Sequence, residues 1–77
     1  MEPEKFIGEK AVYDEAGQII FAQTGEDMQM LLDVRGWGAI QNLPEFKNNA
    51  QKAANFQDEL GEWIAEAINE KLQRERK

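Results

Sequence analysis

Residues 48–73 read NNAQKAANFQDELGEWIAEAINEKLQ, and this segment decides the fold because it has the clearest helical periodicity in the chain. Its apolar residues recur every three or four positions, as Ala50, Ala53, Phe56, Leu60, Ile64 and Ala67, and Trp63 borders this stripe. Such spacing places apolar side chains on one face of an α-helix, and Asn48 or Asn49 can cap its first turn. The sequence predicts a long helix over about 48–73 that packs through this stripe and frays after Leu72.

The segment before the helix alternates as a β-hairpin. Residues 14–17, DEAG, place Asp at the first position of a type I turn and Gly at the fourth. A three-residue loop over 15–17 pairs Tyr13 with Ile19. The residues expected to face the helix are then Ala11, Tyr13, Ile19 and Phe21. We expect strands over about 6–13 and 18–23, with residues 1–5 fraying or leading into the first strand.

A third apolar segment follows a turn signal at Thr24 and Gly25. Met30, Leu32 and Val34 alternate with more polar positions, which is typical of a strand with one apolar face. A short helix over 26–33 is the alternative, because Met and Leu also favour helices. We expect a strand over about 28–35, then a short helical turn over about 39–43 that ends before Pro44.

These elements predict an α+β fold in a single domain over 1–77. An N-terminal three-stranded antiparallel β-meander packs against one long C-terminal α-helix, with a short helical turn between them.

Composition excludes several chemistries. The 77 residues include no Cys and no His, which removes disulfides, thiolate nucleophiles, histidine-based triads and the usual zinc sites. The formal charge of −6 disfavours direct binding to nucleic acid or to an anionic membrane. No apolar run is long enough to suggest a membrane span, and no signal peptide is visible at the start. We therefore expect no cofactor, no metal and a cytoplasmic location.

The turn Arg35-Gly36-Trp37-Gly38 holds a tryptophan between two glycines. Trp and Arg are enriched in binding hot spots, so Arg35 and Trp37 are candidate partner contacts. The alternative is structural: Trp37 covers the seam between helix and sheet, and Arg35 pairs with Asp33 or with a helix glutamate.

An acidic surface on the predicted helix is formed by Asp58 and by four glutamates, Glu59, Glu62, Glu66 and Glu70. A solvated helix face explains them, and a docking face for a basic partner is the functional alternative. Glu59 and Glu62 also resemble, in their spacing, the glutamates that bind magnesium in all-helical nucleotide pyrophosphohydrolases, although those enzymes add acids from further helices.

Gly61 lies in the middle of the predicted helix, where glycine lowers helix stability by about 1 kcal/mol relative to alanine. Its presence there indicates a close approach by another backbone or a large ring. With Ala65, Ile68 and Leu72 it forms a lateral strip beside the main apolar stripe. The strip suits a helix-to-helix contact in a homodimer; alternatively, Trp37 or the second strand packs on it within one chain.

The chain resembles small phage and prophage proteins. The resemblance rests on the D-x-x-G hairpin at Asp14–Gly17, the R-G-W-G turn at Arg35–Gly38 and the I-A-x-A pattern at Ile64–Ala67 within the helix 53–69. Residues 44–52 do not follow the pattern. No activity is assigned to that group, so the resemblance implies no catalytic residue.

Three functional hypotheses follow. The first is a small acidic, non-enzymatic protein-interaction module, encoded by a phage or mobile element, that contacts a protein partner and self-associates through the helix or a sheet edge. The second is an acidic inhibitor or nucleic-acid mimic that binds a basic host protein. The third is a carboxylate-metal nucleotide hydrolase.

Overall fold

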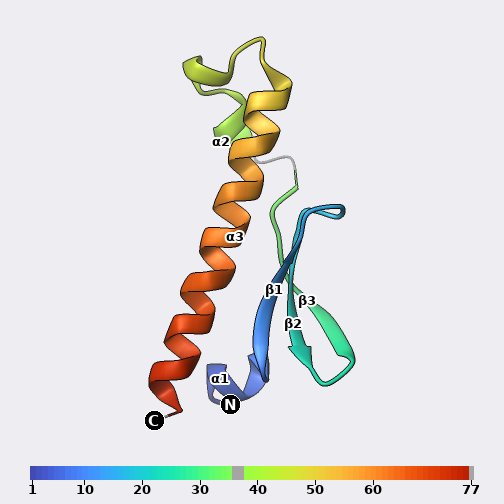
Figure 1. The fold of residues 1–77 in the computed structure, drawn as a ribbon, viewed down its shortest axis with the longest axis vertical. Coiled ribbons are helices and arrows are strands. Elements are labelled where there is room, and N and C mark those ends of the chain that lie inside the picture. The colour runs from blue at the N-terminus through green and yellow to red at the C-terminus, as the bar shows by residue number, and fades with distance from the viewer. Residues whose placement is uncertain (36–37, 77) are drawn as a thin grey trace.

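A long helix lies beside a small sheet in the computed structural model, which describes residues 1–35 and 38–76 (Figure 1). The elements in chain order are α1 (Pro3–Ile7), β1 (Lys10–Asp14), β2 (Ile19–Thr24), β3 (Asp27–Asp33), α2 (Gly38–Gln41), a 3₁₀ turn η1 (Pro44–Phe46) and α3 (Ala50–Glu75). The sheet is antiparallel in the order β1-β2-β3. This confirms the predicted α+β meander and long helix, and residues 27–33 form a strand rather than a helix.

The register of the hairpin differs from the prediction by one residue. Tyr13 pairs with Ile20, and Ala11 pairs with Ala22. The loop has four residues because the chain takes its left-handed conformation at Gln18 (φ 54°) rather than at Gly17, and the Gln18 N–H donates to the Asp14 carbonyl at 2.7 Å. Ile20 and Ala22 are therefore buried, whereas the predicted Ile19 and Phe21 are only half-buried.

An irregularity in the β2–β3 pairing changes which apolar residues of β3 contact the core. Ile20 pairs with Leu32 but Phe21 pairs with Met30, so Leu31 has no partner of its own. Leu31 packs against the core while Met30 and Leu32 are exposed. The predicted apolar face of Met30, Leu32 and Val34 is wrong for the first two. The extra residue reverses the alternation at Met30. Leu32 stays opposite the buried Ile20 but is 39% exposed.

Both ends of α3 differ slightly from the prediction. The Asn49 side chain accepts from the Lys52 N–H at 3.0 Å and caps the helix, as expected for one of the two asparagines. The helix continues to Glu75 instead of fraying after Leu72. Beyond it, the Arg76 guanidinium donates to the carbonyls of Gly8 and Glu9. These carbonyls are within reach because the two ends of the chain lie at the same end of the molecule (Figure 1). At the other end of the chain, the strand predicted over about 6–13 begins only at Lys10. Residues 3–7 form the short helix α1 instead of fraying or entering that strand, with Pro3 in its first turn, where a missing N–H is tolerated.

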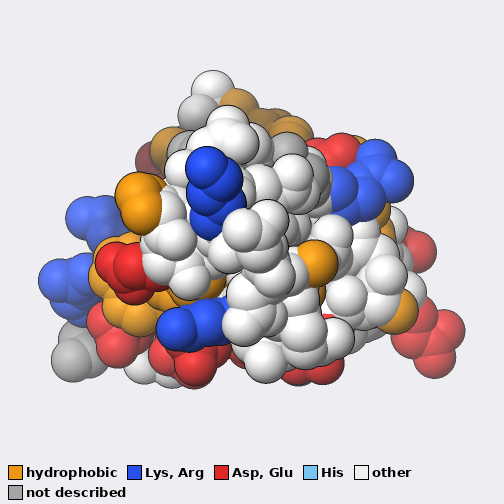
Figure 2. Space-filling model, turned by 90° about the horizontal axis from the view of Figure 1, so that it is seen from above, with side chains coloured by type: hydrophobic (Ala, Val, Ile, Leu, Met, Phe, Trp, Pro, Cys, Tyr) orange, Lys and Arg blue, Asp and Glu red, His pale blue; other side chains and the backbone are white. Residues whose placement is uncertain are grey.

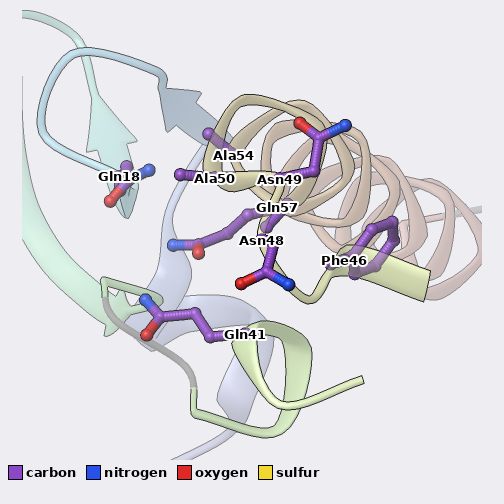
Figure 3. A pocket seen from close by; sticks show the side chains of 9 residues that line it. Gln18, Gln41, Phe46, Asn48, Asn49, Ala50, Ala54 and Gln57 are labelled. Carbon is purple, nitrogen blue, oxygen red and sulfur yellow. The ribbon is translucent and has the colours of Figure 1, made fainter. Parts of the chain in front are cut away.

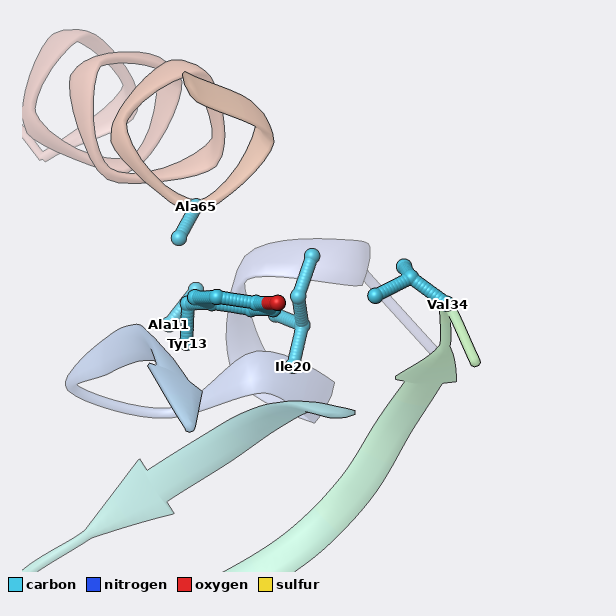
Figure 4. Close-up of a cluster of buried hydrophobic side chains, with 5 residues drawn as sticks. All are labelled: Ala11, Tyr13, Ile20, Val34 and Ala65. Atoms are coloured by element: carbon cyan, nitrogen blue, oxygen red, sulfur yellow. The ribbon is translucent and has the colours of Figure 1, made fainter. Parts of the chain in front are cut away.

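Two apolar clusters form the core. Just after the middle of α3, Ala65 packs on Ala11, Tyr13, Ile20 and Val34 (Figure 4). Nearer the start of α3, Ala53 packs on Ile40 and Phe46. The second cluster lies beyond the sheet, where α2 and η1 cover the helix (Figure 1). Because the clusters lie end to end, the molecule is elongated, with extents of 44 × 23 × 18 Å.

The buried face of α3 shares only Ala53 with the predicted stripe. The buried positions are Ala53, Gln57, Gly61, Ala65 and Leu72. Of the predicted stripe, Ala50, Phe56 and Ala67 are exposed and Leu60 and Ile64 are half-buried. The helix is rotated because Gly61 lies against the Tyr13 ring, and because Gln57 and Asn69 bond to backbone groups of Val34 and Ala11. Apolar periodicity alone does not register such contacts.

One of these bonds protects the sheet edge. β1 is an edge strand, and an edge strand presents unpaired backbone groups. The Asn69 side chain accepts from the Ala11 N–H at 2.7 Å and donates to the Ala11 carbonyl at 2.9 Å. α3 therefore takes the place of a neighbouring strand at the centre of this edge.

We predict that Asn69→Ala lowers the free energy of unfolding by about 1–3 kcal/mol, because it leaves two partly buried backbone groups without partners. Asn55→Ala is the matched control, since Asn55 is exposed and bonds only to Gln51 of the same helix. It should change stability by less than about 0.5 kcal/mol. Urea denaturation of both variants measures the difference, and equal effects would contradict the assignment.

Candidate protein-docking surface

The strip predicted for self-association lies against the protein's own strands. Gly61 is covered by the Tyr13 ring, and an added β-carbon would lie 2.6 Å from Tyr13 Cδ1 and Cζ. Ala65 and Leu72 are buried and Ile68 is half-buried against the core. The close approach inferred at Gly61 is confirmed, and the ring that makes it comes from β1. These four residues are thus engaged within one chain.

The Tyr13 side chain contacts α3 twice, through its ring on Gly61 and through its hydroxyl. Its hydroxyl donates to Asp58 Oδ1 at 2.6 Å. Burial, then the hydrogen bond to Asp58 and the negative charges of Asp58, Glu15 and Glu62, raise the pKa of Tyr13 well above its ordinary value of 10. Asp58 is therefore a structural acceptor as well as a member of the acidic surface.

With Gly61 turned inward, Trp63 faces outward and is 66% exposed. The indole lies where two hollows of opposite character meet. One is a groove of about 550 Å³ between α1 and α3, lined mainly by apolar side chains: Pro3, Ile7, Trp63, Ile64, Ala67, Ile68 and Leu72, with Glu4, Lys71 and Glu75 at its polar positions. The other is an acidic hollow of about 540 Å³, lined by Glu15, Asn55, Asp58, Glu59, Glu62, Trp63 and Glu66.

A smaller apolar notch adjoins both hollows. Its volume is about 320 Å³, and it is lined by Phe56, Glu59, Leu60 and Trp63. Phe56 is 37% exposed, although its ring also contacts the buried Phe46 with centroids 5.4 Å apart. The groove, the notch and the acidic hollow together make one surface centred on Trp63, which we call the Trp63 surface.

Three of the four predicted helix glutamates belong to this surface. Glu59, Glu62 and Glu66 line the acidic hollow beside Trp63. Glu70 is exposed one turn further along α3 and lines neither hollow.

Arg35 lines none of these three hollows. Arg35 pairs with Asp33, with Nη2 2.7 Å from Oδ2, which is one of the two pairings considered for it. Hydrogen bonds from the Arg35 side chain, and then from its backbone N–H, lower the pKa of Asp33 to about 2. The predicted roles of Trp37 fall on a residue that lies outside the described ranges.

A separate hollow of about 550 Å³ lies at the start of α3 (Figure 3). The carboxamides of Gln18 in the β1–β2 loop, Gln41 in α2 and Gln57 in α3 point toward it (Figure 3). None of its nine described lining residues is ionisable. The lining residues are Gln18, Gln41, Phe46, Asn48, Asn49, Ala50, Ala53, Ala54 and Gln57. Figure 2 shows this end of the molecule, where uncharged polar groups and backbone dominate and acidic side chains gather toward the edges. Its lining therefore offers no acid, base or charged nucleophile.

The molecule exposes more surface than its size requires. Its accessible area is 5664 Å², whereas a folded monomer of 8.8 kDa is expected to expose about 4800 Å². The excess of roughly 900 Å² accords with the elongated shape, whose extents are 44 × 23 × 18 Å.

No protein-family model, curated protein or solved structure matches this chain. Across the ranges that the structure describes, no helix combines the length and the apolar character needed to cross a membrane. Within the same ranges, no three His, Cys, Asp or Glu side chains are grouped so as to hold a metal ion.

The residue that sequence reasoning undervalued is Trp63. It was placed at the border of the apolar stripe, where a tryptophan normally helps to fill a core. The signal that could have found it is Gly61, because a ring seated on that glycine turns the helix so that Trp63, two residues on, points away from the sheet.

We predict that Tyr13 resists ionisation. It is the single tyrosine of the chain, so absorbance at 295 nm reports it directly. A raised pKa in the folded state means that the neutral ring stabilises the fold below the unfolded-state pKa of about 10, and that this contribution is lost as pH rises through the folded-state value. Tyrosinate should therefore stay absent at pH 10 and appear at higher pH.

Asp58→Asn is the matched variant, because it keeps the hydrogen-bond acceptor and removes the charge. Its Tyr13 should ionise at lower pH than in the unaltered protein. Half-ionisation near pH 10 in the folded, unaltered protein would contradict the burial and bonding of Tyr13.

Proposed function

We propose that this protein is a non-enzymatic interaction module that binds a protein partner through the Trp63 surface. The observation that carries the proposal is the 66% exposure of Trp63 beside an apolar groove. Burying a large apolar ring from water is favourable, and tryptophans at the centre of interfaces often supply much of the binding energy. A protein partner that covers Trp63 would bury it together with the half-buried Ile64 and the exposed Phe56.

The way the hollows meet supports the same proposal. The groove, the notch and the acidic hollow all include Trp63, so an exposed large apolar side chain lies where the three coincide. Glu59, Glu62 and Glu66 then form a charged rim, which favours orientation and association rate more than affinity.

A second candidate function is an acidic inhibitor that occupies a basic groove on a host protein. The formal charge of −6 and the acidic hollow favour it. The two functions differ in the origin of their binding energy: contacts between charges weaken steeply with added salt, whereas contacts made by a buried indole do not.

Photo-crosslinking in cells that carry the protein tests the proposal. We expect p-benzoylphenylalanine at position 63 to yield a discrete adduct with one protein, because this site is buried in the complex. Placed at Gln29, an exposed residue of β3, the same photoreactive group should yield no such adduct. Absence of a discrete adduct at 63, or the same adduct at both sites, contradicts the proposal.

A salt series in the same cells' extract separates the two candidates. If Trp63 supplies the binding energy, the partner crosslinked at 63 should remain bound to the immobilised protein between 0.1 and about 0.5 M salt, where exposed charge pairs are screened. Release over that range favours the acidic inhibitor.

A further inference from the structure

The partner can be specified further from the way the two hollows meet, an inference that rests on the proposed function. The Trp63 indole lines both the apolar groove and the acidic hollow. A segment lying across Trp63 therefore meets apolar side chains on one side and carboxylates on the other. Such a partner segment needs an apolar side and, next to it along the whole segment, a basic side.

The apolar part of the surface is long and runs along one helix. Phe56, Trp63, Ile64, Ala67 and Ile68 extend over about 18 Å of α3, the length of roughly 12 helical residues. An α-helix with apolar residues at every third or fourth position presents a continuous stripe of that length, and its neighbouring side is free to carry Lys or Arg. An extended strand places alternate residues on opposite sides instead, so it does not suit two adjoining surfaces.

Charge complementarity fixes the sign of the second side. The acidic hollow has five carboxylates, from Glu15, Asp58, Glu59, Glu62 and Glu66, and all except the tyrosine-bound Asp58 have exposed side chains. Like charges at this density repel one another, and cationic side chains from a partner relieve that repulsion. The exposed indole also favours a guanidinium or ammonium group above its face.

A second copy of the chain fits this surface less well. Two α3 helices that cross antiparallel at Trp63 bring the glutamates of one copy against those of the other, because the same side of each helix meets in that arrangement. Such contacts are destabilising. The small residues that would allow close helix packing, Gly61 and Ala65, already pack against the Tyr13 ring and the core cluster of the same chain.

We propose that the Trp63 surface binds a basic amphipathic helix of a partner protein. The apolar side of that helix lies in the groove between α1 and α3, and its Lys or Arg side chains contact the acidic hollow. Trp63 lies between these two sets of contacts and is shared by both.

A synthetic peptide of Leu and Lys tests this assignment. The probe is an amidated peptide of about 18 residues with a helical Leu stripe, titrated into the ¹⁵N-labelled protein. We expect shifts of the Trp63 indole and of the backbone amides of residues 56–67 and 4–7, and none on Met28 or Met30. A peptide with every Lys replaced by Glu should cause no shifts. Shifts centred on the sheet, or equal binding of the acidic peptide, overturn the proposal.

Matched variants separate specific recognition from general attraction to an acidic protein. Glu59→Gln with Glu66→Gln removes two charges from the hollow, and Glu26→Gln with Asp27→Asn removes two from the exposed β2–β3 turn. The first pair should weaken peptide binding about tenfold and the second less than about twofold, because exposed charges at a distance are screened. Trp63→Ala should weaken it about thirtyfold, as for a central interface residue. Equal effects of the two pairs overturn the proposal.

The two proposals fail in different ways. If the basic peptide does not bind but a discrete adduct forms at position 63 in cells, the interaction function stands and the partner chemistry is wrong. If neither is observed, both are wrong. A dimer in sedimentation equilibrium that Trp63→Ala dissociates also overturns the partner assignment, because a second copy then occupies the surface.

Discussion

The contact between the Tyr13 ring and the backbone of Gly61 is the constraint on which the rest of the structure depends. A side chain at position 61 would collide with the ring, so the glycine lets β1 lie directly against α3. The glycine weakens the helix by about 1 kcal/mol relative to alanine. In return, a large aromatic ring is buried at the centre of a small core, and the Tyr13 hydroxyl fixes the helix through Asp58 at 2.6 Å.

This contact sets the rotation of α3, and the rotation decides which residues are left outside. Gln57 donates to the Val34 carbonyl and Asn69 bonds to both backbone groups of Ala11, so the helix meets the sheet through polar groups on either side of Gly61. The buried apolar contribution of the helix is therefore made largely by small residues. Phe56 and Trp63, the two aromatic residues of α3, lie further from the sheet than the half-buried Leu60 and Ile64. They form a surface suited to a partner.

Sequence patterns predict most of the fold and less of the site. Alternation, turn residues and helical spacing identify the three strands, the long helix and a cap at Asn48 or Asn49, because each depends on neighbours in the chain. The one-residue error in the hairpin arose because Gln18, rather than Gly17, takes the left-handed conformation, and no local rule favours glutamine there. The wrong helix face has a similar origin: Gln57 and Asn69 read as surface residues until their backbone partners, far away in sequence, are known. The acidic glutamates were found readily, whereas Trp63 was not, since its exposure follows from the rotation.

The most direct measurement is a double-mutant cycle between Tyr13 and Gly61, with the free energy of unfolding determined by urea denaturation. Alone, Gly61→Ala should lower that free energy by about 1–3 kcal/mol, because the added methyl group overpacks the ring. In the background of Tyr13→Val, which keeps strand propensity and removes the ring, the same substitution should raise it by up to about 1 kcal/mol through helix propensity. The same effect in both backgrounds would contradict the account, since the ring would then not be what requires glycine at position 61.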